Sequence, residues 1–386
     1  MASSDAFPRG RTAVVGAATF GIGEAPGFES IDLAAQASLL ALGDAGVGLD
    51  EVDAIFVGLP QDYLSGLTLA EYLGVQPILT DNNRTGGSSF LTHTVWAALA
   101  LAAGLCDVAL VAYGSNQRTG AGRLVSSWSG SNFEAPYKAT MPVSGYALAA
   151  ARHMHEYGTT REQLAAVAVA ARQWAALNPE AFMRETLSVE QCLATRMVND
   201  PLTVRDCCLV TDGAAAIVMT RAERAGDLAQ QPVYFLGAGA TVTHKEIAQM
   251  PDLTVTGATE SGARAYAQAG VGAADIDLVQ LYDAFTINTV LFLEDLGFCP
   301  KGEGGRFVGD GAIAPGGALP VNTNGGGLSC VHPGMYGLFT LVEAVHQLRS
   351  TAGDRQITGA KLALCHGNGG VLSSQATNIL GTAETL

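Results

Sequence analysis

Two glycine-rich stretches near the C-terminus combine a freely turning backbone with side chains that can move protons. Glycine lets the backbone approach a ligand closely, and imidazole, thiol and phenol groups can act as acids or bases. The spacing therefore predicts one active site in which backbone N–H groups and proton-transferring side chains meet a substrate. The candidates are Asn324, Cys330, His332 and Tyr336 in the stretch Asn322 to Tyr336, and Cys365, His366, Gly369 and Gly370 in the stretch Cys365 to Gly370.

A further candidate is Tyr282, at the end of a strand predicted from Leu278 to Tyr282. Its phenol can donate a hydrogen bond, or act as general acid or base if its surroundings lower its pKa from about 10. The alternative interpretation is a tyrosine that closes the core. Cys365 has a similar alternative as a buried, unreactive thiol, because free cysteines often simply pack. Cys365 and His366 remain competing candidates for the acid–base role in the last stretch.

A third glycine-rich segment, Asn82 to Phe90, lies in the first half of the chain and contains no cysteine. A helix is expected to begin there at about Ser88, and a second helix at about His332. Helix N-termini stabilise negative charge by about 0.3–1 kcal/mol when exposed, so a place where two of them meet suits an enolate or a thioester oxyanion. The substrate-binding candidates here are Arg84, Ser88 and Ser89, with a helix cap as the alternative role of either serine.

The elements that must position these residues occur twice. The stretch Ala45 to Val57 returns as Ala269 to Leu281, at an offset of 224 residues, and each copy reads as a helix end, a turn and a buried strand. Helices end again at Gly74 and Gly297. A repeat of this length predicts duplication of a whole α/β unit rather than a solenoid. Seven strands are expected, at 12–16, 54–58, 108–113, 215–220, 233–238, 278–282 and 361–366.

Composition limits the partners and the compartment. The chain has 386 residues and a formal net charge of −15, which argues against nucleic acid as a partner. A local basic patch of Arg118, Arg123 and Lys138 could still hold a phosphorylated cofactor. No apolar run is long enough for a membrane span, and the histidine and cysteine spacings predict no metal site. The seven cysteines without CxxC pairs and the absence of a signal-like N-terminus predict reduced thiols in the cytoplasm.

The motifs, taken together and in order, resemble the thiolase superfamily. Tyr282-Asp-Ala-Phe285 stands where thiolases have Asn-Glu-Ala-Phe, His332-Pro-Gly334 matches their histidine motif, and Cys365 to Gly370 resembles their last glycine-rich motif. The resemblance is to the branch of sterol-carrier-protein thiolases and lipid-transfer proteins, including retro-aldolases that lack the nucleophilic cysteine. It implies a five-layer αβαβα fold with two similar halves, 1–230 and 231–386, and a loop region at about 115–170 over the site.

The resemblance also implies what the site does. The leading expectation is retro-aldol cleavage of a 3-hydroxyacyl-CoA without an acyl-enzyme, with His332 holding the thioester oxygen and Tyr282, His332, Cys365 or His366 moving protons. The alternatives are a thiolase or acyltransferase acting on a 3-oxoacyl-CoA, and a non-catalytic carrier of CoA esters or lipids. Coenzyme A is expected as part of the substrate, with no tightly bound cofactor. A homodimer is expected, with a small zinc-ribbon and OB-fold protein as a possible partner.

Overall fold

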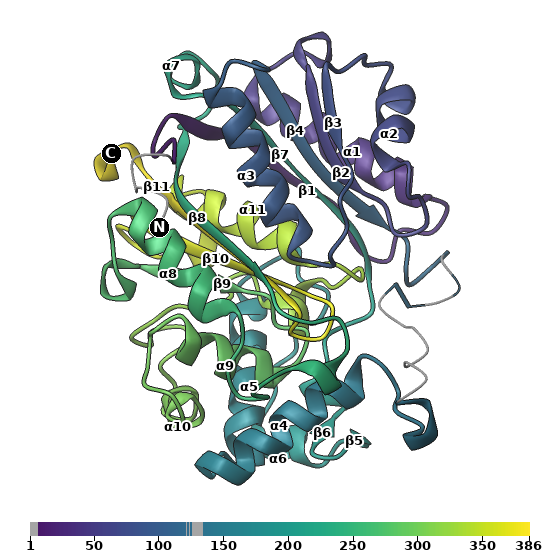
Figure 1. Ribbon diagram of the computed structural model, residues 1–386, viewed down its shortest axis with the longest axis vertical. Helices are drawn as coiled ribbons and strands as arrows, with labels where there is room; N and C mark the ends of the chain where they lie inside the picture. The colour runs from purple at the N-terminus through teal and green to yellow at the C-terminus, as the bar shows by residue number, and fades with distance from the viewer. Residues whose placement is uncertain (1–6, 121, 123, 126–133) are drawn as a thin grey trace.

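The computed structural model of the protein describes residues 7–120, 122, 124–125 and 134–386. Figure 1 shows sheets and helices stacked in layers, with a mainly helical part at the lower end. The strands of the main sheet are β1 Thr12–Gly23, β2 Ala54–Gly58, β3 Leu79–Asp81, β4 Val108–Ser115, β7 Asp212–Arg221, β8 Val233–Val242, β9 Leu278–Leu281, β10 Leu362–Gly369 and β11 Ser374–Gly381, and β5 Met197–Asn199 pairs with β6 Leu202–Thr203 in a separate ribbon.

All seven expected strands are confirmed, and their order in the sheet is β3-β2-β4-β7-β1-β8-β11-β10-β9. The first half has the order β3-β2-β4-β7-β1. The second half repeats it as Val321, β9, β10, β11 and β8, with Val321 in the place of β3 because it bridges Val279 of β9 in parallel. Orientation repeats as well, because β4 and β10 each have a parallel neighbour on one side and an antiparallel neighbour on the other. The two sub-orders join where β1 pairs briefly with β8 at Val14↔Val233.

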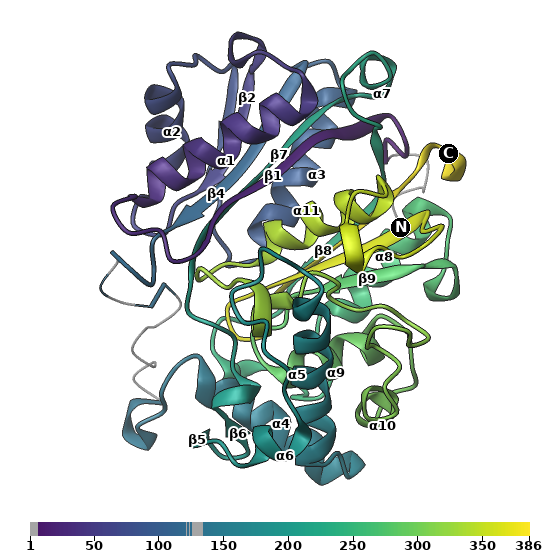
Figure 2. The same ribbon diagram turned by 180° about the vertical axis from the view of Figure 1, so that it is seen from behind.

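Helices cover these strands on three levels, which gives the expected five layers. The helix bounds are α1 Ser30–Ala45, α2 Ser65–Leu73, α3 Ser89–Ala102, α4 Val143–Tyr157, α5 Arg161–Ala176, α6 Val189–Leu193, α7 Ala222–Ala225, α8 Ala258–Ala269, α9 Thr286–Asp295, α10 Gly304–Gly309 and α11 Gly337–Leu348. Helix α1 packs on β1, β4 and β7, and α8 packs on β8 and β11. Between the two sets of strands, α3 and α11 pack on each other (Figures 1 and 2).

Glycine ends the helices that precede and follow the repeated strands, as predicted. Gly46 and Gly270 close α1 and α8, and Gly74 closes α2, all three with φ near +70°. An l-amino acid side chain is strained in this left-handed conformation, so glycine is the residue that lets the chain turn there. The chain therefore enters β2 and β9 through the same kind of turn. The turn before β9 sets where this strand begins and so where Tyr282, the residue after it, lies.

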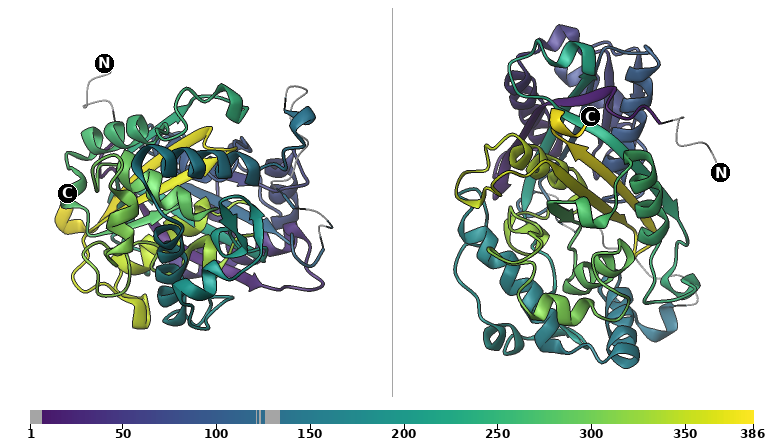
Figure 3. Two further views of the ribbon diagram at one scale, coloured as in Figure 1. Left: turned by 90° about the horizontal axis from the view of Figure 1, so that it is seen from below. Right: turned by 90° about the vertical axis from the view of Figure 1, so that its left-hand side faces the viewer.

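The region between β4 and β7 differs from the expectation of a long loop at 115–170. Helix α4 begins at Val143, α5 follows at Arg161, and Gly158 with φ 72° separates them. Before residue 143 this region contains no α-helix among the described residues, and between α5 and β7 its α-helix is the short α6. Figures 1 and 2 show α4, α5 and α6 beside α9 and α10 at the end of the molecule where β9 and β10 terminate, and Figure 3 gives two further views of this helical part. The predicted boundary at residues 230/231 falls in the connection between α7 and β8.

Candidate active site

Tyr282 and His332 meet at the C-terminal end of β9. The backbone N–H of Tyr282 donates to the carbonyl of His366 at 2.9 Å, which extends the pairing of β9 with β10. The Tyr282 hydroxyl lies 3.1 Å from Nε2 of His332, and the two rings meet edge to face at 5.5 Å between centroids. Both side chains are at most 5% exposed. The structure therefore brings two of the predicted proton-transferring groups into direct hydrogen-bond contact.

The backbone around His332 is held from three sides. Its N–H donates to the Thr211 hydroxyl at 3.0 Å, and its carbonyl accepts from Nε2 of Gln117 at 3.3 Å. The Tyr113 hydroxyl accepts from the N–H of Met335 at 3.2 Å and donates to the carbonyl of Pro333. These contacts come from β4 and from the segments that follow β4 and precede β7, so the first half of the chain fixes the imidazole of the second half.

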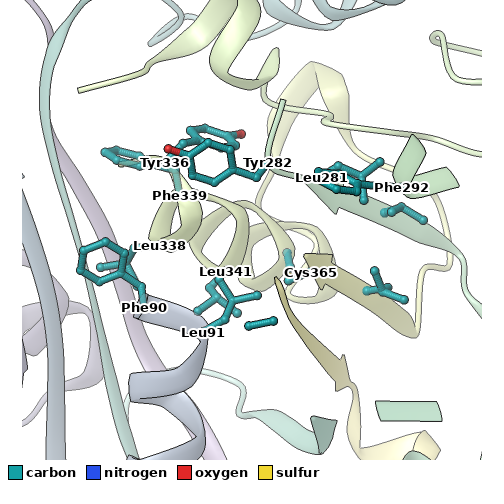
Figure 4. Packing of buried hydrophobic residues seen from close by; sticks show 14 of the residues in the cluster. Phe90, Leu91, Leu281, Tyr282, Phe292, Tyr336, Leu338, Phe339, Leu341 and Cys365 are labelled. Atoms are coloured by element: carbon teal, nitrogen blue, oxygen red, sulfur yellow. The ribbon is translucent and has the colours of Figure 1, made fainter. Parts of the chain in front are cut away.

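Tyr336 completes an aromatic group around the pair. Its ring lies 5.9 Å from that of Tyr282 and 6.5 Å from that of His332, and Figure 4 shows the two tyrosine rings next to each other above Phe339. The Tyr336 hydroxyl donates to Oδ1 of Asn324 at 2.9 Å, which accounts for two more of the predicted residues. This arrangement leaves the Tyr282 hydroxyl and the His332 imidazole as the adjacent proton-transferring groups.

Burial keeps both members of the pair uncharged. It lowers the pKa of His332 to about 4 and raises the pKa of Tyr282 well above its usual value, with Cys208 and Tyr146 nearby adding to the latter. The condition under which Tyr282 alone would act as general acid or base, a lowered pKa, is not met in this arrangement, because desolvation penalises the phenolate. At neutral pH a neutral phenol faces a neutral imidazole, and a proton can be exchanged between them through the 3.1 Å contact.

Gly87, immediately before α3, makes room for Tyr282. A Cβ atom at Gly87 would lie 1.8 Å from Cε2 of Tyr282 and 2.7 Å from its Cζ, so the ring fills the space that a side chain would need. The backbone of Gly87 also touches the second inner helix, since a Cβ at Gly337 would lie 2.0 Å from the Gly87 carbonyl oxygen. The two inner helices therefore begin side by side at the phenol, as expected. The second begins at Gly337 rather than at about His332, because the stretch from His332 to Tyr336 is not helical and Gly334 within it has φ 94°.

The three candidates of the first glycine-rich segment are engaged elsewhere. Ser88 donates to the Ser374 hydroxyl at 2.9 Å, and Ser89 accepts from the N–H of Thr85 at 2.7 Å. Ser88 occupies the N-cap position of α3, but neither its hydroxyl nor that of Ser89 makes a capping hydrogen bond. Arg84 is exposed, and its Nη1 donates to the carbonyls of Leu59 and Pro60 at 2.9 and 2.7 Å.

Neither Cys365 nor His366 contacts Tyr282 or His332. Successive side chains of β10 point to opposite faces of the sheet, so the thiol and the imidazole lie on different sides. The Cys365 thiol donates to the Thr340 carbonyl of α11 at 3.4 Å, within the core (Figure 4), and burial raises its pKa. The His366 ring bonds Thr377 and Gln375, both at 2.9 Å, and burial lowers its pKa to about 4. This placement gives no support to an acid–base role for either residue.

The remaining candidates shape the backbone around the site. The Cys330 thiol is buried, 3.6 Å from Nδ2 of Asn178, and burial raises its pKa well above the usual value. A Cβ at Gly369 would lie 1.9 Å from the Thr85 carbonyl oxygen, so glycine is required for this close approach. Gly370 has φ 62° and accepts from the Tyr146 hydroxyl at 3.0 Å through its carbonyl.

Two residues at the site were missed from the sequence besides Gly87. Tyr146 of α4 stacks on Phe285 at 4.4 Å, and its hydroxyl accepts from Nδ2 of Asn368 at 2.8 Å. The Asp283 carboxylate accepts from the N–H of Gly327 at 2.6 Å and so anchors the π-helical turn before His332. Asp283 was available in the Tyr282-Asp-Ala-Phe285 motif. No local pattern marked Tyr146, because it lies where the periodicity is weak.

A cavity of about 650 Å³ lies against α4 on the side away from Tyr146. Its lining includes Ser144, Ala147, Leu148 and Ala151 of α4, together with Lys138, Met250 and Leu253. Lys138 is thus the member of the predicted basic patch that reaches a cavity. Arg118 pairs with Glu24 at 2.7 Å instead, and Arg123 lies outside the described residues.

The described residues show neither a metal centre nor a membrane segment. No group of three or more His, Cys, Asp or Glu side chains in this part of the chain could hold a metal ion. None of the helices described is both long and apolar enough to cross a bilayer.

Comparisons with known proteins agree with the repeated layers and the motif order. Residues 239–382 match the family model for a thiolase C-terminal domain-like region. The chain is 36% identical to an acetyl-CoA acetyltransferase of Methanothermobacter thermautotrophicus, over 95% of this chain and 98% of the relative. It is 34% identical to a 17-hydroxy-3-oxo-4-pregnene-20-carboxyl-CoA lyase of Mycobacterium tuberculosis, over 89% and 92% of the two chains. The solved Ltp2-ChsH2(DUF35) aldolase is similar with a TM-score of 0.88 and 31% identity, over 97% of this chain and 98% of that one.

The layered fold, with two inner helices meeting at a buried site, is the thiolase fold. The chain belongs to the thiolase superfamily, in the branch of the sterol-carrier-protein thiolases and lipid-transfer proteins that has retro-aldolase relatives.

Proposed function

We propose that the protein cleaves the Cα–Cβ bond of a 3-hydroxyacyl-CoA by a retro-aldol reaction, without forming an acyl-enzyme. The observation that carries this proposal is the neutral pair of Tyr282 and His332 beside Gly87. The phenol fills the space in front of α3 that a side chain at position 87 would need. A phenol and an imidazole that can exchange a proton are therefore adjacent at this point.

The proton can travel along the observed hydrogen bond. The β-hydroxyl of the substrate gives its proton to the Tyr282 oxygen, while the phenol proton passes to Nε2 of His332, 3.1 Å away. The Cα–Cβ bond then breaks, the β-carbon becomes a carbonyl, and its bonding electrons form the enolate of the shortened acyl-CoA. The imidazolium stabilises this enolate, and returning the proton along the same path to Cα restores the neutral pair.

The cavity of about 650 Å³ beside α4 is proposed to bind part of the acyl-CoA. Its size is in the range of small-molecule sites, and Lys138 in its lining offers a cation to a phosphate. The similar lyase from Mycobacterium tuberculosis is named after a carboxyl-CoA compound, 17-hydroxy-3-oxo-4-pregnene-20-carboxyl-CoA. This name supports a CoA ester as the substrate class. Coenzyme A enters as part of the substrate in this proposal.

Acyl transfer by a thiolase-type reaction is the second candidate, and the 36% identity to an acetyl-CoA acetyltransferase favours it. It requires a thiolate, whereas burial raises the pKa of Cys330, Cys365 and Cys208. The two reactions differ in stoichiometry. Aldol cleavage releases an aldehyde or ketone without added CoA, and thiolysis consumes free CoA.

The test uses Tyr282→Phe, which removes one oxygen and leaves the ring to pack. With a 3-hydroxyacyl-CoA as substrate, we expect carbonyl release to fall by about 10²–10⁴-fold, while acyl-CoA affinity and the thermal midpoint stay close to those of the parent protein. Tyr234→Phe on β8 is the matched control. Lost stability with unchanged turnover would make Tyr282 a packing residue, and CoA-dependent cleavage of a 3-oxoacyl-CoA would favour the second candidate. Binding of acyl-CoA with neither reaction would favour a carrier.

Assembly is part of the proposal. The Ltp2-ChsH2(DUF35) aldolase is named as a complex, which supports a DUF35-type partner, corresponding to the expected small zinc-ribbon and OB-fold protein. A homodimer and a cytoplasmic location remain predictions.

A further inference from the structure

A second cavity, of about 240 Å³, lies on the other side of the Tyr282-Asp-Ala-Phe285 segment. Helix α5 forms one wall through Ala168 and Arg172, and the segment before β7 forms another through Arg205, Cys207 and Cys208. Leu328 and Ser329 of the π-helical turn close it. The reaction proposed above uses none of these side chains directly.

Arg172 brings a buried positive charge into this cavity. Its side chain is 3% exposed, its Nε donates to the Ser329 hydroxyl at 3.0 Å, and its Nη1 donates to the Glu185 carbonyl at 3.0 Å. Both partners are neutral. Among the residues that the structure describes, no carboxylate lies within 4.0 Å of this guanidinium. Burial lowers the pKa of Arg172 by more than the Glu185 charge raises it. A buried cation without an ion-pair partner is costly, so an anionic ligand would be bound there with a substantial gain.

Arg205 adds a second guanidinium to the same cavity. Its Nε is buried and has no hydrogen-bond partner. The carboxylate next to it in sequence, Asp206, is occupied: one oxygen accepts from the N–H and hydroxyl of Thr203, and the other accepts from Thr286 at 2.8 Å. The positive charges of Arg172 and Arg205 repel each other. Burial lowers the pKa of Arg172, and the Arg205 charge lowers it further. An anion between them would remove that repulsion.

The cavity is connected to the catalytic pair by short backbone contacts. The N–H of Cys208 donates to the carbonyl of Ala284 at 2.8 Å, two residues after Tyr282, and the N–H of Leu209 donates to the Gly327 carbonyl at 2.9 Å. Ser329, the partner of Arg172, lies three residues before His332. A group bound to the two arginines would therefore lie one layer of residues away from the reacting atoms.

We infer that this cavity is a binding site for an anionic oxygen group, a carboxylate or a phosphate, carried by the substrate. The inference rests on the proposed acyl-CoA function for the identity of the ligand. A planar guanidinium binds either group through paired hydrogen bonds. Two sources fit the chemistry: a phosphate of coenzyme A, or a carboxylate on the acyl group remote from the thioester.

Direct anion binding tests the site without any turnover. The full-length protein is titrated with inorganic phosphate and with succinate, and the thermal midpoint is followed, because a ligand that binds only the folded state raises it. We expect both anions to raise the midpoint of the parent protein. Their apparent affinity should fall by about 10–100-fold in Arg172→Gln and in Arg205→Gln, since each loses a charged hydrogen-bond donor. Arg184→Gln, an exposed arginine close to Glu185 in sequence, is the matched control and should behave like the parent.

Two pairs of ligands distinguish the two possible sources of the anion. If the site holds a phosphate of coenzyme A, Arg205→Gln weakens CoA more than 3′-dephospho-CoA, or weakens both equally when the pyrophosphate is bound. If it holds an acyl carboxylate, the variant weakens succinyl-CoA and leaves butyryl-CoA unchanged. Arg205 is only half-buried, so this variant should fold even if Arg172→Gln does not.

Unchanged binding of phosphate, succinate and all four CoA compounds in both arginine variants would overturn the inference. Binding of inorganic anions that depends on the arginines, in a protein that cleaves no acyl-CoA, would support the site and contradict the proposed function. Loss of cleavage with normal anion binding would leave the site intact, so the two proposals fail separately.

Discussion

At the scale of single residues, Gly87 and Tyr282 decide which chemistry has room at the start of α3. The ring of Tyr282 occupies the position of a Cβ atom at residue 87, with 1.8 Å to its Cε2. A side chain at position 87 and the phenol in its present place exclude each other.

Gly87→Ala should reduce turnover by about 10²-fold or more, because displacing a catalytic group by about 1 Å has an effect of that size. It should also lower the free energy of unfolding by about 1–3 kcal/mol through overpacking. Gly43→Ala on α1, where a Cβ would meet no atom within 4 Å, is the matched control. In a Tyr282→Ala background Gly87→Ala should cost little further stability, because the ring is gone. Full turnover in Gly87→Ala would contradict the assigned position of the phenol.

The cysteines should be unreactive toward iodoacetamide at neutral pH. Burial raises the pKa of Cys330, Cys365 and Cys208, so little of the thiolate that would attack the reagent is present. We expect turnover to survive incubation with the reagent, with papain treated in parallel as a positive control for its activity. Rapid inactivation with one label on Cys330, Cys365 or Cys208, located by mass spectrometry, would instead favour acyl-enzyme chemistry.

The sequence was sufficient to predict Tyr282 and His332, because each stands in a local motif whose residue types already suggest proton transfer. It was not sufficient for Gly87, whose importance depends on a ring 195 positions further along the chain. Cys365 and His366 looked equivalent in sequence. Only the register of β10 shows that one side chain faces α11 and the other faces β11.

At the scale of elements, the expected strands were found because each is a short apolar run bounded by turn residues. Strand β11, Ser374–Gly381, was missed: it is rich in serine, threonine, glutamine and asparagine, and hydrogen bonds to buried neighbours satisfy several of these side chains. The start of α11 was placed too early, at about His332, although Pro333 and Gly334 stand in the non-helical stretch that separates His332 from the helix at Gly337.

Helix α3 carries a histidine that should make the fold sensitive to acid. His93 is fully buried beside Phe56 and Phe90, neither ring nitrogen has a hydrogen-bond partner, and burial lowers its pKa to about 4. In the unfolded chain the pKa is near 6.5, so between pH 6.5 and 4 the unfolded state binds a proton that the folded state does not. Stability from this residue is therefore complete above pH 6.5 and is lost as the pH falls toward 4, by about 3 kcal/mol in all.

His93→Leu should remove this loss. The thermal midpoint of the variant, compared with that of the parent, should rise progressively from pH 7 to pH 4, whereas His155→Leu at an exposed position of α4 should show no such trend. His332 and His366 titrate in the same direction, so the parent protein should still lose stability in acid when His93 is replaced. A pH-independent difference between His93→Leu and the parent would mean that the pKa of His93 is the same in the folded and the unfolded state.

At the scale of the whole molecule, the two ends of the nine-stranded sheet differ. At one end, Val321 pairs with Val279 of β9 and covers that strand in part. At the other end lies β3, which has β2 as its neighbour on one side, while the described residues provide no strand on the other. Large apolar side chains are exposed around β3, with Tyr63 at 81%, Leu67 at 60% and Ile78 at 78%. An uncovered edge strand surrounded by apolar surface favours association with a second chain.

We predict a homodimer through this edge, since a two-fold axis would let the same surface of two subunits cover each other. Light scattering at micromolar concentration should give about twice 39.7 kDa for the parent protein. The double variant Leu67→Glu/Ile78→Lys places charges on the apolar surface without touching the core, and should give a mass near 39.7 kDa with a little-changed circular dichroism spectrum. Val242→Lys, at a 70% exposed position at the end of β8, is the control and should remain dimeric. A monomeric parent would show that the edge is open in solution, and a dimeric double variant would place the interface on another face of the molecule.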